Sequence, residues 1–407
     1  MPQWYQSRFL KSEARESKFH YLDLKPDILT TSNGIKYQRK ALLRWGPPRC
    51  FYEDDLYTTR FPGWQSTDIE EKFFGGIDSK GKDAVEYFSD FAHPSADIEA
   101  FHSFLSYVSV QRLRTPKGLS YLGAITKSGD KNQLLFEMQE LHRMHCALWT
   151  ECVWSIVDAL ESNTKFIVSD NPVIFYNQRC FPESKYCRGD NDPGIWLNGT
   201  YTIFPLSLNK ALILTNLSWA RNPYGNPTKE RPHPELFRGA MFNFTQIQTG
   251  RTLCEQDVIA INYIIKKRAS RYIAAAEEEW LYPEKHLKFK RWDQIGKSHL
   301  LMPDPRSMTF SSEILIGYSN GKSDAFDEYG RKPWHADYKE ENRHQEEWDT
   351  FHAFQGEYAR LFGPKRRGLA YEFGDKESSV DSDDYHAYHL SLEAKCKSKI
   401  KRSHGKK

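Results

Sequence analysis

The chain has 407 residues, with 39% hydrophobic, 27% charged and 14% aromatic side chains and a formal net charge of +3. This length accommodates one large or two ordinary domains with a sizeable core, and the aromatic content argues against general disorder. The charge is too nearly balanced to create a field that favours nucleic acid or a membrane surface, and no apolar run approaches the roughly 20 residues that span a bilayer.

The cysteines and the N-terminus favour a cytoplasmic protein. The seven cysteines form an odd set without a Cys-x-x-Cys pair, which is typical of reduced thiols. Cys180 and Cys187 are separated by six residues, wider than the usual spacing in a zinc knuckle. The first residues lack the basic and then apolar pattern of a signal peptide. We therefore expect a cytoplasmic location without membrane association.

The first part of the chain, to about residue 64, is divided by Pro and Gly into short aromatic runs. Residues 32–34, Ser-Asn-Gly, predict a hairpin turn. A helix is expected to begin at Thr67, where acidic residues follow a capping residue, to break at Gly75 and Gly76, and to resume over residues 84–88.

Periodic apolar residues predict two stronger helices, over about residues 95–114 and 132–160. Residues 165–176 then place two β-favouring runs around Ser-Asp-Asn-Pro, which predicts strand, tight turn and strand. Further strands are expected at 201–204 and 210–215, and a helix at about 253–280. Helices followed by strands and a helix indicate an α+β fold, with a helical layer packed on a small, mostly antiparallel sheet.

The character of the chain changes after residue 282. Residues 346–362 predict one amphipathic helix, and residues 375–407 have the acidic and then basic blocks of a flexible charged tail. We therefore divide the chain into a core domain (1–282), a C-terminal extension of mixed helix and loop (283–374) and the tail (375–407).

The Ser-Asp-Asn-Pro segment carries the main candidate site. A buried strand that ends in Asp170 and Asn171 would hold a carboxylate and an amide on a rigid edge, and Pro172 restricts their backbone. The alternative is an Asx-type turn, in which Asp170 bonds its own backbone and has no chemical role.

Several motifs together resemble the domain of unknown function 4238 family, which is bacterial and uncharacterised. Pro2-Gln3-Trp4-Tyr5 with Phe9-Leu10 is similar to its opening segment. Its Gln-x-x-Arg-Thr-Pro element is matched at residues 111–116, and its Ser-Asp-Asn-Pro motif at residues 169–172. Phe204-Pro205-Leu206-Ser207 and the helix from Val258 to Ile273 complete the resemblance, which covers roughly residues 1–282. The histidine that usually precedes the first motif has no counterpart here, and the family implies no activity.

Other charged residues offer alternatives for the same pocket. Arg112 and Arg114 stand at a helix end, where they either meet the helix dipole or hold an anion, with Arg114 facing Asp170. Glu71 either stabilises a helix start or adds a carboxylate to the pocket. We expect Ser169 to bind substrate in the same pocket.

Three further patterns are weak. His142 and His145 are one helical turn apart but have no recognisable third metal ligand. Asp170 followed by Glu183-Ser184-Lys185 matches a nuclease pattern only superficially, because Glu183 lies in a loop. The basic and aromatic residues 285–291 suit contact with a polyanion or a plainly solvated surface.

These observations lead to two functional hypotheses. In the first, a polar pocket around Arg114, Asp170 and Asn171 binds an anionic ligand, a nucleotide or nucleic acid. In its enzymatic version, Asp170 is a general base or a ligand of a divalent metal and Asn171 orients the substrate for hydrolysis. In the second, the chain is a non-catalytic interaction protein whose motifs only build the fold.

Overall fold

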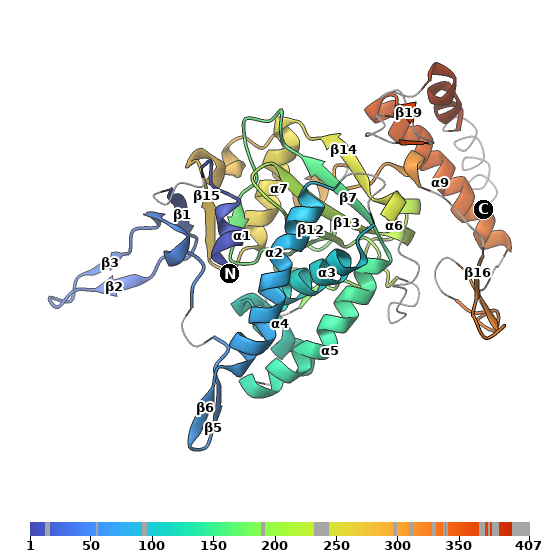
Figure 1. Ribbon diagram of the computed structural model, residues 1–407. Helices are drawn as coiled ribbons and strands as arrows, with labels where there is room; N and C mark the ends of the chain where they lie inside the picture. Colours follow the sequence, from blue (N-terminus) through green and yellow to red (C-terminus); the bar gives the residue numbers. More distant parts are fainter. Residues whose placement is uncertain are drawn as a thin grey trace.

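The chain folds around two mostly antiparallel sheets, which a computed structural model places in one layered body (Figure 1). The residues that the structure describes are 1–12, 17–53, 56–91, 96–127, 129–188, 192–231, 244–295, 299–308, 313–327, 331–336, 338, 341–365, 371–372, 375–376 and 382–392.

The larger sheet has five strands in the order β14-β7-β13-β12-β9. Their bounds are Gln248–Thr252 (β14), Cys152–Asp158 (β7), Lys210–Asn216 (β13), Tyr201–Pro205 (β12) and Ile174–Tyr176 (β9). All neighbouring strands are antiparallel except β14 and β7.

The smaller sheet has four antiparallel strands in the order β4-β1-β15-β8. Their bounds are Leu42–Trp45 (β4), Phe19–Asp23 (β1), Tyr272–Ala275 (β15) and Val168–Ser169 (β8). The α+β fold with mostly antiparallel sheets is therefore confirmed.

The helices lie on both sides of the larger sheet. Their bounds are Gln3–Ser7 (α1), Gly75–Ser89 (α2), Ile98–Leu113 (α3), Pro116–Thr126 (α4), Lys131–Thr150 (α5), Leu217–Arg221 (α6), Glu255–Arg268 (α7), Trp292–Ile295 (α8) and Glu341–Phe362 (α9). In the part of the chain that the structure describes, no helix is long and apolar enough to cross a membrane.

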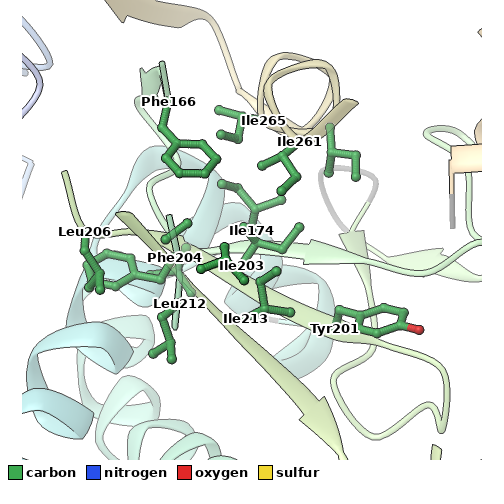
Figure 2. Packing of buried hydrophobic residues seen from close by; sticks show 14 of the residues in the cluster. Phe166, Ile174, Tyr201, Ile203, Phe204, Leu206, Leu212, Ile213, Ile261 and Ile265 are labelled. Atoms are coloured by element: carbon green, nitrogen blue, oxygen red, sulfur yellow. The ribbon is translucent and has the colours of Figure 1, made fainter. Parts of the chain in front are cut away.

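The central strands are apolar at nearly every position because both faces of the sheet are covered. Ile203 faces Ile261 and Ile265 of α7 (Figure 2). The next residue, Phe204, faces the opposite side, where its ring lies 6.0 Å from that of Phe104 in α3. Burial on both faces explains why these strands lack the alternation of a half-exposed sheet.

The remaining strands form short two-stranded pairs. Their strands are Ile28–Thr30 (β2) with Lys36–Gln38 (β3), Thr59–Phe61 (β5) with Trp64–Ser66 (β6), Cys187–Arg188 (β10) with Asp192–Pro193 (β11), Ile314–Gly317 (β16) with Ser323–Phe326 (β17), and Tyr371–Glu372 (β18) with Asp375–Lys376 (β19). The hairpin turn expected at residues 32–34 is confirmed, with Gly34 at the positive φ of +77° that favours glycine.

Two predicted helices run too far along the sequence. The second long helix ends at Thr150, and the residues 152–158 assigned to it form the central strand β7. The helix expected at 253–280 ends at Arg268, and residues 272–275 form β15. In both places a continuing apolar pattern belonged to a buried strand, which periodicity alone does not separate from a buried helix.

The strand, turn and strand predicted at residues 165–176 are present as β8, the Ser-Asp-Asn-Pro turn and β9, and this segment crosses from one sheet to the other. Strand β8 pairs with β15 in the smaller sheet, whereas β9 pairs with β12 in the larger one. The expected break at Gly75 and Gly76 is wrong, because a π-helical turn at Ile69–Phe74 continues directly into α2.

The C-terminal part shares the main core. Ile295, Leu300 and Phe354 belong to the same cluster of buried hydrophobic residues as Tyr5 and Phe19. The division of the chain at residue 282 stays a prediction. The helix expected at 346–362 is confirmed as part of α9. Residues 383–392 of the expected flexible tail are helical, and residues 377–381 and 393–407 lie outside the described part of the chain.

Gly118 provides a test of the close packing between α3 and α4. A Cβ atom at this position would lie 2.4 Å from the carbonyl oxygens of Arg112 and Leu113. We expect Gly118→Ala to lower the free energy of unfolding by about 1–3 kcal/mol, as overpacking does, in urea titrations followed by tryptophan fluorescence. Gly76→Ala is the control, because a Cβ there meets nothing within 4 Å. Equal stabilities for the two variants would contradict this packing.

Candidate functional site

The carboxylate of Asp170 binds the main chain at the start of β15. It accepts hydrogen bonds from the backbone amides of Ser270 (2.8 Å), Arg271 (2.7 Å) and Tyr272 (2.9 Å). Burial raises the pKa of Asp170, and the three amides oppose this effect. The expectation that this carboxylate is open to a ligand is therefore wrong, because its oxygens bind backbone that lies a hundred residues away in the sequence.

Asn171 joins the two motifs of the core. Its Oδ1 accepts a hydrogen bond from Nη1 of Arg112 at 2.9 Å, and its Nδ2 donates to the carbonyl oxygen of Arg268 at 3.1 Å. The Ser169 hydroxyl donates to the carbonyl oxygen of Asn171 at 2.8 Å. The Gln-x-x-Arg-Thr-Pro and Ser-Asp-Asn-Pro segments thus meet through Arg112.

Arg114 lies on the other side of the same helix end. Its guanidinium forms a bidentate pair with the carboxylate of Asp78, with both distances 2.8 Å, and lies over the ring of Phe74. The expectation that Arg114 faces Asp170 is therefore wrong. Helical residues two apart point in nearly opposite directions, so only one of the two arginines can face the Ser-Asp-Asn-Pro turn.

Glu71 also stays outside this region. Its carboxylate accepts a hydrogen bond from the hydroxyl of Thr67 at 2.7 Å, and its side chain is exposed. The stabilisation of a helix start is the alternative that the structure supports. Glu71 adds no charge to the surroundings of Asn171.

Arg112 belongs to a buried group of charges that we call the cationic cluster: Arg112, Lys117, Asp192 and Arg268. Asp192 lies 2.6 Å from Nη2 of Arg112, 2.9 Å from Nζ of Lys117 and 3.8 Å from Nη1 of Arg268. The four side chains are between 0% and 4% exposed. Among the described residues, three cations therefore lie around the carboxylate of Asp192.

The cluster is also held by backbone carbonyl groups. Lys117 donates from Nζ to the carbonyl oxygen of Arg268 at 2.6 Å, and Arg268 donates to the carbonyl oxygen of Cys180. Thr115 caps α4 by accepting a hydrogen bond from the amide of Gly118 at 2.9 Å, and Pro116 occupies the first helical position. This local structure directs Lys117 towards Arg268.

The ionisation of the cluster follows from burial and attraction together. Burial alone would raise the pKa of Asp192, but the attraction of Lys117, Arg112 and Arg268 lowers it. Burial lowers the pKa of Lys117, an effect that Asp192 opposes. Asp192 is thus a carboxylate at neutral pH, and the surrounding cations stabilise its negative charge.

Aromatic rings enclose the two arginines. The guanidinium of Arg112 lies 4.5 Å from the ring centre of Phe175 and 5.3 Å from that of Tyr121. The guanidinium of Arg268 lies 4.8 Å from the ring centre of Trp292. Stacking of this kind suits the flat, weakly hydrated guanidinium group.

His145 lies beside the cluster as a neutral, fully buried side chain. Its ring is 5.5 Å from that of Trp149 and 5.9 Å from that of Phe175, and neither ring nitrogen has a hydrogen-bond partner among the described residues. Burial, followed by repulsion from Arg112, lowers its pKa from 6.5 to about 3.

The described residues contain no group of three His, Cys, Asp or Glu side chains that could hold a metal ion. Glu183 lies in an exposed turn with a φ of +72°, so the superficial nuclease pattern falls outside regular structure. Within this part of the chain, no such group of side chains is available to bind the divalent metal of the enzymatic hypothesis.

Residues 146–279 match the family model described as protein of unknown function (DUF4238). The resemblance inferred from the motifs is confirmed over this segment. No curated protein and no solved structure matches the chain. The DUF4238 match contains Asp170, Asn171, Asp192 and Arg268, whereas Arg112 and Lys117 precede it.

The sequence reasoning missed Lys117, Asp192 and Arg268. Lys117 directly follows the Thr-Pro pair, so the start of a helix there was a usable signal. Arg268 is the last residue of α7, and the predicted helix continued past it to residue 280. Asp192 lies in a long loop near Gly and Pro, and its sequence context gave no signal.

Asp170→Asn tests the structural role of the carboxylate. The amide can accept from fewer backbone N–H groups, and its own N–H donors would face them. We expect the free energy of unfolding to fall by about 1–3 kcal/mol, measured in urea. Glu71→Gln, at an exposed position, should change it by less than about 0.5 kcal/mol. An Asp170→Asn variant as stable as the wild type would show that the three hydrogen bonds from the backbone amides contribute little to stability.

His145 predicts a pH dependence of stability. Below its ordinary pKa of 6.5 the unfolded chain takes up a proton, which the folded chain does not take up until about pH 3. This contribution is therefore lost as the pH falls, at up to about 1.4 kcal/mol per pH unit. We expect His145→Phe to remove that slope in unfolding titrations between pH 7 and 4.5. His102→Phe, at an exposed position, should retain it; an unchanged slope in His145→Phe would refute the assignment.

Proposed function

We propose that the chain binds an anionic ligand at the cationic cluster, and that this ligand carries phosphate, as a nucleotide or nucleic acid does. The observation that carries the proposal is that two buried cations, Arg112 and Lys117, share the carboxylate of Asp192 within the part of the chain that the structure describes. Two buried cations that share one carboxylate would be stabilised by an added anion.

The unused donors of Arg112 support this proposal. Its Nη1 donates to Asn171 and its Nη2 pairs with Asp192, but its Nε has no hydrogen-bond partner among the described residues. An arginine donates in a planar fork that matches the oxygens of a phosphate or carboxylate. An anion beside Nε would satisfy a buried donor and offset the charge at the same time.

The surface next to Trp292 supports a phosphate-bearing ligand. Trp292 packs over Arg268 and donates from its indole N–H to the carbonyl oxygen of Asn177 at 2.8 Å. It directly follows the exposed basic residues 285–291, where Phe289 is 65% exposed. Lysines with an interleaved aromatic ring combine phosphate contacts with base stacking.

The proposal concerns binding without hydrolysis. Asp170 accepts hydrogen bonds from three backbone amides, and Asp192 pairs with cations, so neither carboxylate is placed to act as a general base. The amide of Asn171 is engaged with Arg112 and with the backbone. These contacts support a site that holds charge, and none of them supports the metal-dependent hydrolase version.

A second candidate is the non-catalytic interaction protein. The contacts of Asp170 and Asn171 favour it, because both side chains bond within the chain and connect the crossover to α3 and β15. In this interpretation the motifs fix the fold, and the function belongs to surfaces elsewhere. The unpaired cysteine thiols among the described residues support a reducing location such as the cytoplasm for either function.

Anion binding can be measured as stabilisation of the folded protein. We expect the wild type to unfold at a higher temperature in sodium pyrophosphate or AMP than in sodium chloride of equal ionic strength. A ligand at 100 times its Kd stabilises by about 2.7 kcal/mol. Lys117→Met keeps the length of the side chain but removes one cation, so it should reduce this increase.

Lys210→Met is the matched control, because Lys210 lies outside the cluster next to Asp90. It should keep the full response to pyrophosphate. If chloride stabilises the wild type as much as pyrophosphate does, or if Lys117→Met retains the whole increase, binding at the cluster is refuted and the interaction protein becomes the better account.

A further inference from the structure

The hairpin of β2 and β3 extends beyond the smaller sheet as an arm, which we define as residues 24–41. Strands β1 and β4 pair inside that sheet, and the chain between them continues outward as β2 and β3. Figure 1 shows this arm pointing away from the body. Within the described part of the chain, β2 and β3 have only each other as strand neighbours.

The base of the arm is fixed by one arginine. The Nη2 atom of Arg271 lies 2.8 Å from Asp23 in β1 and 2.7 Å from Asp27 in the arm. Asp27 also accepts a hydrogen bond at its carbonyl oxygen from the amide of Arg39 at 2.9 Å. The arm is therefore anchored at its base while its outer half stands in solvent.

The two faces of the arm differ in chemistry. The register pairs Leu29 with Tyr37, and Ile35 lies on the same face two residues away. The opposite face is mixed: it carries Thr30, Lys36 and Gln38 together with Ile28, which is 71% exposed. Leu29 is 40%, Tyr37 50% and Ile35 65% exposed. An apolar face of this kind on an isolated two-stranded hairpin is unfavourable in water until something covers it.

Both edges of the arm offer unused backbone groups. Thr31 donates its amide to the carbonyl oxygen of Ile35, so the next pair along, Thr30 with Lys36, is of the non-hydrogen-bonded type. In such pairs the N–H and C=O groups point away from the partner strand. The outer edges at Thr30 and Lys36 are thus templates for an added strand.

The arm is strongly basic for its length. Lys25, Lys36, Arg39 and Lys40 face a single acidic residue, Asp27, whose carboxylate is already paired with Arg271. The cations favour an acidic partner, whereas Leu29, Ile35 and Tyr37 favour an apolar one. A phosphate backbone would satisfy only the first requirement. A strand that alternates acidic and apolar residues satisfies both.

We propose that the arm is a docking surface for an acidic polypeptide segment, which adds as a third strand and covers the face of Leu29, Ile35 and Tyr37. Its backbone pairs with a free edge, its apolar side chains cover this face, and its carboxylates meet the lysines. The proposal uses no residue of the cationic cluster and is independent of anion binding there.

The probe is a fluorescein-labelled peptide of ten residues that alternates Glu and Val, tested with the full chain by fluorescence anisotropy. We expect it to bind, and we expect peptides that alternate Lys with Val or Glu with Pro to fail. The first reverses the charge, and the second keeps the charge but cannot pair along a strand. Binding of the Glu-Pro peptide with equal affinity would overturn strand addition.

Two double variants locate the binding on the arm. Lys36→Glu/Lys40→Glu and Leu29→Ser/Tyr37→Ser should each weaken binding at least about tenfold, which corresponds to 1.4 kcal/mol. Lys82→Glu/Lys322→Glu makes the same charge change at exposed positions elsewhere, and it should leave the affinity within about twofold. All variants should unfold at the temperature of the wild type, because the substituted side chains are exposed.

Two outcomes would refute the proposal. In one, the arm variants bind the Glu-Val peptide as well as the wild type does. In the other, the peptide fails to bind while an oligothymidylate binds with the same dependence on Lys36 and Lys40, which would make the arm a nucleic-acid contact.

Discussion

The three hydrogen bonds to the carboxylate of Asp170 hold the two sheets in their relation to each other. The Ser-Asp-Asn-Pro turn carries the chain from β8 in the smaller sheet to β9 in the larger one, and Asp170 fixes this crossover to the first residues of β15. With the crossover fixed, Asn171 reaches Arg112 and Arg268. The position of the cationic cluster thus depends on an acidic residue that is not part of it.

The cluster combines features that rarely occur without a ligand or a structural need. Arg112, Lys117 and Arg268 lie around the carboxylate of Asp192, and the two arginines also stack on aromatic rings, which lowers the cost of burying them. His145 cannot offset this charge, because it is neutral. The anion binding that we propose would use these cations and requires no chemistry from Asp170.

Local patterns predicted much of the fold and little of the site. The helix over residues 98–113 and the strands at 201–205 and 210–216 were visible because their apolar spacing or β-branched runs were clear. The strands at 152–158 and 272–275 were hidden in predicted helices, since full burial removes the alternation that identifies a strand. Which of Arg112 and Arg114 faces the Ser-Asp-Asn-Pro turn depends on how the helix is rotated against its neighbours, which the sequence does not show. The position of Asp192 beside the arginines depends on the tertiary fold.

Arg271 connects two regions of the fold through separate parts of the same residue. Its main-chain amide bonds to Asp170 at the crossover, and its guanidinium holds Asp23 and Asp27 at the base of the arm. The crossover therefore depends on a group that every residue except proline possesses, whereas the arm depends on one particular side chain. A substitution at position 271, other than by proline, would therefore remove a side-chain anchor of the arm and leave the amide bond at the junction between the sheets intact.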